Sequence, residues 1–139
     1  MDRNDLIQYV RARRLAVVAT TSADGSPQAA VVGVAATGAG DLVFDTTRGS
    51  RKFANLSRQP RVALVIGVDW GDVQTLQLEG VAVEIAKDDP AVAAYFEQFP
   101  DGRERAEWPD IVYVRVRPAW GRHSDYRSGS SEVREVSLS

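Results

Sequence analysis

The residues best suited to chemistry lie in one stretch, residues 45–52, with the sequence Asp-Thr-Thr-Arg-Gly-Ser-Arg-Lys. Ser50 is a good N-cap, because its hydroxyl can accept a hydrogen bond from a free backbone N–H of the first helical turn. A helix start with exposed N–H groups beside Arg51 and Lys52 is suited to binding a phosphate. The chemistry predicted for this stretch is therefore anion binding, in a chain whose net charge is −2.

Two other interpretations of this cationic stretch stay open. Arg48, Arg51 and Lys52 can simply be a solvated loop and helix start, although cations at a helix N-terminus oppose the dipole by roughly 0.3 kcal/mol or more. A nucleic-acid patch is the third interpretation, but the sequence has no second basic stripe with interleaved aromatic residues. Two cations in the first turn, beside Ser50 and Thr47, favour a bound anion.

Length and composition set the frame for this site. The 139 residues predict one domain, spanning residues 1–139, with enough chain to bury a substantial core. The absence of cysteine removes disulfide and thiolate chemistry. No apolar segment follows the charged N-terminus, and no apolar run approaches the ~20 residues that span a bilayer. We expect a soluble cytoplasmic protein, and the acidic balance gives no reason to expect a nucleic-acid or membrane partner.

The elements before the cationic stretch are predicted from periodicity and turn residues. Residues 5–14 read as a helix, and the valine-rich run 15–20 as a strand buried on both faces. An Asp-Gly turn within 23–27 leads into a return strand over 28–36. Small residues on that strand leave room either for a flat group or for a closely packed neighbouring element. A third strand over 42–46 then runs into the cationic stretch.

The remaining elements follow from apolar patterning. A helix begins after Ser50 and stops before Pro60, where a fourth strand follows. The apolar phase of the next, long strand shifts at Gly80, which predicts a β-bulge or a sharp barrel corner. Asp89 is the expected N-cap of a second helix, and Pro118 is expected to end a strand. The predicted ranges are strands 62–67, 75–85, 111–116 and 120–126, with a partly mobile or partner-docking tail over 128–139.

These elements predict a mainly β fold with small helices. Six or so short strands without regular βαβ alternation indicate a mostly antiparallel barrel. Neither repeats nor a low-complexity linker interrupt the chain.

The same residues resemble the pyridoxamine 5′-phosphate oxidase-like family, the FMN-binding split β-barrels. The resemblance is carried by the order and spacing of short motifs: Asp24-Gly25-Ser26-Pro27, Leu42-Val43-Phe44-Asp45-Thr46, Ser50-Arg51-Lys52, Asn55-Leu56, Pro60-Arg61-Val62 and Glu79-Gly80-Val81-Ala82. It implies a split β-barrel, a six-stranded antiparallel Greek-key-like barrel. It also implies a homodimer with two flavin sites at the subunit interface.

The resemblance also implies which residues touch FMN. The phosphate would be held by Ser50, Arg51 and Lys52. The strand after the Asp-Gly turn would lie against the isoalloxazine ring. A glutamine on the long strand and a tryptophan after the last long strand would complete the site. The further implied contacts are Val31, Val32, Gly33, Asp45, Thr46, Thr47, Gln77 and Trp120.

One departure from the family pattern bears on the substrate. True oxidases carry a basic residue at the end of the second strand, where an ungapped alignment puts Ala35. We therefore expect an FMN-dependent oxidoreductase that acts on another small molecule, and not on pyridoxamine 5′-phosphate. The alternatives are a reductase using the deazaflavin coenzyme and a non-catalytic module that binds flavin or haem.

His123 is the only histidine of the chain. A Ser-His-Asp triad lacks a nucleophile-elbow sequence, and His123 with Asp125 supplies too few ligands for a typical metal site. Haem ligation stays open through the resemblance, because some split-barrel relatives handle haem. The plainer alternative is a hydrogen-bonded histidine near one end of the barrel.

Overall fold

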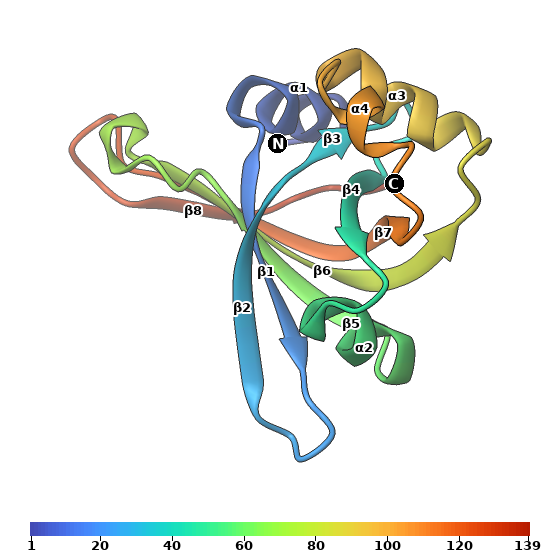
Figure 1. Ribbon diagram of the computed structural model, residues 1–139. Helices are drawn as coiled ribbons and strands as arrows, with labels where there is room; N and C mark the ends of the chain where they lie inside the picture. Colours follow the sequence, from blue (N-terminus) through green and yellow to red (C-terminus); the bar gives the residue numbers. More distant parts are fainter.

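The computed structural model describes residues 1–139 as one curled sheet with small helices packed against it (Figure 1). The strands are β1 (Leu15–Thr21), β2 (Pro27–Gly33), β3 (Ala35–Ala36), β4 (Leu42–Thr47), β5 (Arg61–Ile66), β6 (Gln74–Ile85), β7 (Ile111–Asp125) and β8 (Glu132–Glu135). The helices are α1 (Arg3–Arg13), α2 (Arg51–Arg58), α3 (Pro90–Gln98) and α4 (Gly102–Arg105), with a 3-10 turn η1 (Trp70–Asp72). None of these helices combines the length and the apolar character needed to cross a membrane.

Every strand pairing is antiparallel, in the order β2-β1-β5-β6-β7-β4-β3, with β8 added to β7. The sheet curls into an open half-barrel, and Figure 1 shows the β1–β2 hairpin extending beyond it. This arrangement confirms the predicted mainly β split barrel. The sheet has eight strands rather than about six, because the second predicted strand divides and the tail adds β8.

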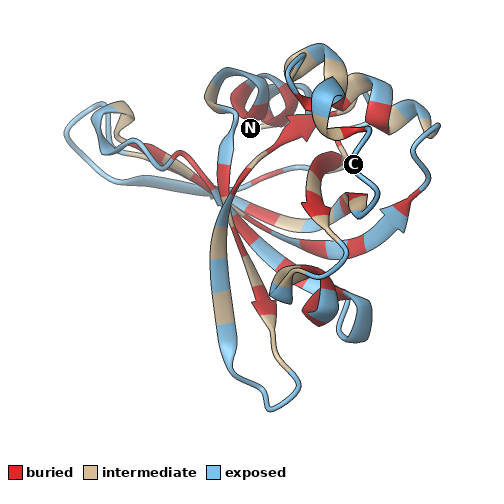
Figure 2. Cartoon of the chain, in the orientation of Figure 1, coloured by how far each residue is buried: buried red, intermediate tan, exposed pale blue.

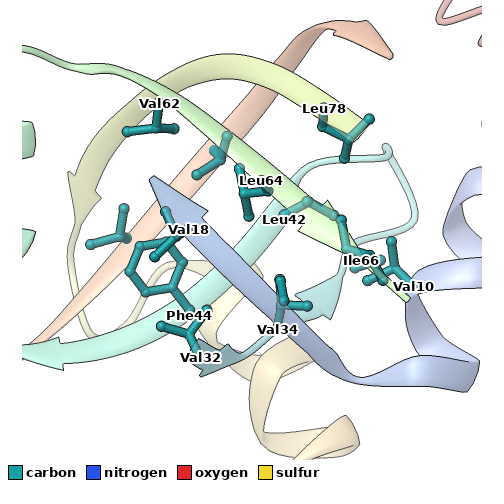
Figure 3. Close-up of a cluster of buried hydrophobic side chains, with 14 of the residues drawn as sticks. Val10, Val18, Val32, Val34, Leu42, Phe44, Val62, Leu64, Ile66 and Leu78 are labelled. Atoms are coloured by element: carbon teal, nitrogen blue, oxygen red, sulfur yellow. The ribbon is translucent and has the colours of Figure 1, made fainter. Parts of the chain in front are cut away.

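The concave face of the sheet encloses the main core (Figures 2 and 3). Side chains from neighbouring strands alternate inward, and the close-up shows Val18 and Val32 beside the ring of Phe44. A second, smaller cluster lies between α3 and the other side of β4 and β7, around Tyr95 and Tyr113. Strand β4 therefore has a covered surface on each side.

Strand β1 corrects the expectation of burial on both faces. Its residues alternate, with Ala16, Val18 and Thr20 buried and the residues between them more exposed. The run is apolar throughout, yet only one of its faces packs on the barrel core. The other face of β1 continues into an exposed apolar row on the sheet, which bears on assembly.

The predicted return strand also divides in two. Residues 27–33 pair with β1, whereas Ala35 and Ala36 pair with β4, so the chain changes partner at Val34. Val34 is fully buried, and its N–H donates to the carbonyl of Arg14. This crossover opens the barrel between β2 and β3.

The β-bulge expected at Gly80 is confirmed as a register shift between Glu79 and Gly80. The expected break at Pro118 is wrong, because β7 runs without interruption from Ile111 to Asp125. Pro118 lies opposite Gly80 in the same irregular step, where a residue without an N–H fits the ladder. The bulge in one strand and the proline in the next thus occupy one position of the sheet.

The tail contains ordered contacts with the rest of the chain. Residues 132–135 form β8, Val136 is buried, and the N–H of Ser137 donates to the carbonyl of Met1. The short helix α4 was not predicted, since its four residues are too few for a periodic pattern.

Candidate functional site

The turn between β4 and α2 brings together the hydroxyls and cations predicted there. Ser50 is the N-cap of α2, and its Oγ accepts a hydrogen bond from the N–H of Phe53 at 3.1 Å. The Thr46 hydroxyl donates to Ser50 Oγ at 2.9 Å, and Lys52 Nζ donates to Thr46 Oγ1 at 3.4 Å. The result is a chain of donors from Lys52 through Thr46 to Ser50.

Two of the three cations of this turn, Arg51 and Lys52, have no acidic partner, whereas Arg48 pairs with Glu84 at 2.7 Å. Arg51 is exposed, and neither Arg51 nor Lys52 forms a salt bridge in the structure. Burial lowers the pKa of Lys52, and the carboxylate of Asp45 opposes that shift only partly. A half-buried ammonium without an ion pair is energetically costly, and a bound anion would remove that cost.

A groove of about 370 Å³ opens beside this turn. Its second wall is the β1–β2 hairpin, and its lining residues are Val18, Thr20, Gln28, Ala29, Ala30, Ser50, Arg51 and Lys52. Ala29 and Ala30, both small, line the groove along β2. The groove therefore joins the predicted anion site to the strand predicted to face a flat ring.

Thr20 and Gln28, which line this groove, and Asn55, which bonds both of them, were not predicted as site residues. The buried side chain of Asn55 donates to Thr20 Oγ1 at 3.0 Å and to Gln28 Oε1 at 2.7 Å. It thereby links α2 to both strands of the hairpin. Asn55 belonged to the motif Asn55-Leu56 of the family resemblance, but nothing in the sequence indicated its partners.

Other predicted residues lie away from the groove. The Asp45 carboxylate faces the helices outside the sheet, where Arg105 Nε lies 2.8 Å from its Oδ2. Thr47 contributes its backbone carbonyl, which accepts from the N–H of Ser50 at 3.0 Å. Val32 is buried in the main core.

Val31 and Gly33 also lie outside the groove, each for a different reason. Val31 is 63% exposed, on the convex face of the sheet. A Cβ at Gly33 would lie 3.0 Å from the Phe99 ring, so a small residue is required there by the packing of the segment after α3. Close packing, and not an open space for a ligand, thus accounts for glycine at this position.

Gln77 and Trp120 lie on the convex face, on the far side of the sheet from the groove. Gln77 Oε1 accepts from Arg122 Nη2 at 3.1 Å, and Trp120 Nε1 donates to Glu135 Oε1 at 3.3 Å. Trp120 also lines an open hollow of about 420 Å³ on this face, together with Ala63 and Glu79. Within one chain, the predicted contacts thus form two groups on opposite faces.

His123 points into the barrel end, where it is held by neighbours. Its Nε2 lies 3.1 Å from Gln74 Oε1, and its ring meets the Tyr9 ring edge-on with centroids 5.7 Å apart. Burial lowers the pKa of His123. No group of three or more His, Cys, Asp or Glu side chains is placed to hold a metal ion.

The comparisons with known proteins agree with this fold. The curled antiparallel sheet with small outer helices is the split-barrel class, and the sequence model of the family described as pyridoxamine 5′-phosphate oxidase matches residues 5–125. The chain belongs to the pyridoxamine 5′-phosphate oxidase family.

Two curated relatives are similar to the chain in sequence. The desampylase of Haloferax volcanii is 31% identical over 128 residues, covering 86% of this chain and 84% of that protein. The pyridoxine/pyridoxamine 5′-phosphate oxidase of Rubrobacter xylanophilus is 32% identical over 93 residues, covering 66% of this chain and 41% of that protein. The match therefore spans about two fifths of the oxidase's own length.

Two solved structures share the fold. A heme binding protein from Mycobacterium smegmatis superposes with a TM-score of 0.79 at 19% identity, covering 98% of this chain and 58% of that one. A pyridoxamine 5′-phosphate oxidase-related, FMN binding protein from Nostoc punctiforme gives a TM-score of 0.71 at 15% identity, covering 95% and 93%. Structures of this shape thus include an FMN-binding and a heme-binding protein.

Proposed function

We propose that this protein binds FMN and acts as a flavin-dependent oxidoreductase on a small molecule. The observation that carries the proposal is the turn where Ser50, Arg51 and Lys52 offer a helix start and two unpaired cations to one groove. The phosphate of FMN suits such a helix start. When bound, the flavin supplies the redox chemistry, and the chain supplies binding and orientation.

The hydrogen bonds of the turn support specific roles. Ser50 Oγ already accepts from Phe53 N–H and from the Thr46 hydroxyl, so its own proton is free to donate to a phosphate oxygen. Lys52 and Arg51 would add charge-assisted hydrogen bonds. Because Ala29 and Ala30 line the groove, the ring would lie along β2.

The remaining predicted contacts on β2 and at Thr47 are proposed to act through backbone atoms and not through side chains. Val31, Val32 and Gly33 would serve the ring through the backbone of β2, since none of their side chains enters the groove. Thr47 would act through its backbone carbonyl, which holds Ser50.

We propose a homodimer with the flavin shared between two copies. A flavin in the groove of one copy lies across the sheet from that copy's Gln77 and Trp120, so a second copy would have to supply these residues. The convex face also carries a cross-strand apolar row of Val31, Val17 and Val65, with Val31 63% and Val65 37% exposed. Covering such a row with a second copy removes apolar surface from water.

The substrate proposed is not pyridoxamine 5′-phosphate. Ala35 is fully buried beneath α3, so no cation stands where the oxidases hold the substrate phosphate. Arg122 is bonded to Gln77, and Arg127 is paired with Asp125 at 2.7 Å. A buried phosphate without cations carries a large desolvation cost.

We therefore predict that the FMN-loaded protein oxidises pyridoxamine 5′-phosphate negligibly, while its reduced flavin still passes electrons to an artificial acceptor. Absorbance of pyridoxal 5′-phosphate follows the first reaction. Steady formation of that product would mean that arginines of the C-terminal segment supply the missing phosphate site.

The visible spectrum of the purified protein tests the cofactor. A pair of flavin bands supports the proposal. A single band in the violet would show that the bound cofactor is the deazaflavin coenzyme, and would indicate a deazaflavin-dependent reductase. A Soret band would instead indicate a haem-binding module with His123 as the first ligand to examine.

A further inference from the structure

Asp45 lies next to the proposed phosphate site, yet its carboxylate takes no part in it. Successive side chains of β4 point to opposite sides of the sheet, so Thr46 meets Ser50 and Asp45 faces the outer helices. There the Asp45 side chain is only 16% exposed, and Arg105 Nε lies 2.8 Å from its Oδ2. Arg105 is the only cation that forms a salt bridge with this carboxylate.

Arg105 is fixed on this face by further contacts. Its Nη2 donates to the Tyr95 hydroxyl at 3.0 Å, and Asp101 lies within 3.8 Å of its Nη1. Burial raises the pKa of Tyr95 to about 12, so the phenol stays neutral. The Tyr113 hydroxyl, on the residue paired with Asp45 across the sheet, is buried without a hydrogen-bond partner. The Asp45 carboxylate therefore has one cation to neutralise it, and the neighbouring Tyr113 hydroxyl donates no hydrogen bond to it.

We propose that Arg105 is a positioning residue for the anion site: by pairing with Asp45 it neutralises the carboxylate that directly precedes Thr46, and so leaves the Lys52 ammonium free for a phosphate. The inference rests on the proposed function, because it concerns the same site. It also explains why an acidic residue precedes a turn that binds an anion.

The electrostatics give the reason. Asp45 directly precedes Thr46, whose hydroxyl oxygen accepts from Lys52 Nζ at 3.4 Å, so its negative charge acts on the ammonium through the strand and opposes the lowering of the Lys52 pKa by burial. Without Arg105, the unneutralised carboxylate would weaken the attraction of Lys52 for an anion and repel the phosphate dianion across the strand. One such unscreened charge lowers affinity for the phosphate by about tenfold and leaves an uncharged ligand largely unaffected. Salt would reduce the penalty, because screening weakens charge interactions.

The test compares Arg105→Gln, Asp45→Asn and the double variant by fluorescence titration with FMN and with riboflavin, which lacks the phosphate. Arg105→Gln should weaken FMN binding about tenfold at low salt and leave riboflavin binding unchanged. The double variant should regain the affinity for FMN, because the carboxylate charge is gone. Asp45→Asn alone should bind FMN at least as tightly as the unaltered protein.

Arg103→Gln is the matched control, because Arg103 lies on the same short helix, is exposed, and has its guanidinium over the Phe96 ring rather than beside Asp45. It should change neither affinity. Circular dichroism checks that each variant is folded, and the Asp45→Asn result stands even where Arg105→Gln does not fold.

Three outcomes would overturn the inference: equal losses for FMN and riboflavin, no recovery in the double variant, or weakened FMN binding by Asp45→Asn. If the unaltered protein binds no FMN, the proposed function fails, and inorganic phosphate becomes the probe, followed by amide shifts of residues 50–53. The same ranking of variants for phosphate would support the inference. No phosphate binding at these amides would overturn it as well.

Discussion

A single buried amide joins the two walls of the groove. The Asn55 side chain is 5% exposed and bonds both Thr20 on β1 and Gln28 on β2. Polar groups that are buried in this way need their partners, because each unsatisfied one costs its desolvation energy. The position of the β1–β2 hairpin relative to α2 therefore depends on Asn55.

Asn55→Ala should lower the free energy of unfolding by about 1–3 kcal/mol, because it leaves Thr20 and Gln28 without their donor. Ser57→Ala, on the exposed side of the same helix, should change it by no more than about 0.5 kcal/mol. Urea denaturation measures both. Equal stability of the two variants would contradict the role given to Asn55.

Whether a contact of the site could be predicted depends on how far apart its two residues are in the sequence. The cap at Ser50 could be predicted, because its partner Phe53 is three residues away. The bonds of Asn55 to Thr20 and of Arg105 to Asp45 join residues 35 and 60 positions apart. Such contacts arise only from the folded sheet, so the residues alone carried no sign of them.

At the scale of elements, β6 and β7 meet at one irregular step. A Cβ on Gly80 would lie 2.4 Å from the backbone carbonyl oxygen of Arg117, so the backbones could not approach as they do. The shift of apolar phase made this bulge predictable. The passage of β7 through Pro118 was not predictable, because it depends on the glycine opposite.

Gly80→Ala should destabilise the fold by about 2–3 kcal/mol, since the added methyl group meets backbone and not a flexible side chain. Gly38→Ala is the matched control, because a Cβ there has nothing within 4 Å. Thermal unfolding followed by circular dichroism compares them. A Gly80→Ala protein as stable as the control would show that the two strands do not pack as described.

The second predicted strand divides into β2 and β3, and the pattern of its residues does not predict this division. Residues 28–36 are continuously small and apolar, and nothing in them marks the change of partner at Val34. Antiparallel pairing with β1 and then with β4 is decided by the curvature of the whole sheet. The order of the elements was thus predictable, whereas the crossover that opens the barrel was not.

At the scale of the whole molecule, α3 covers the outer side of β4 and β7, whereas the convex side of β1, β2 and β5 keeps its apolar row exposed. Light scattering should give the mass of a dimer, and flavin occupancy should fall as dilution separates the copies. Val31→Lys should shift the protein to monomer, because it places a charge at the most exposed position of the apolar row.

Val83→Lys is the matched control, since Val83 is 40% exposed but lies beyond the bulge and outside that row. It should remain a dimer. A stable monomer that keeps its flavin would contradict the shared site.

The most direct measurement of the central claim is a paired fluorescence titration of FMN and riboflavin against the unaltered protein and Lys52→Ala. A charge-assisted hydrogen bond is worth roughly 1.5–3 kcal/mol, so loss of Lys52 should weaken FMN binding about tenfold to a hundredfold. Riboflavin binding should change much less, because riboflavin has no phosphate. Equal losses for the two ligands would contradict the assignment of this turn as the phosphate site.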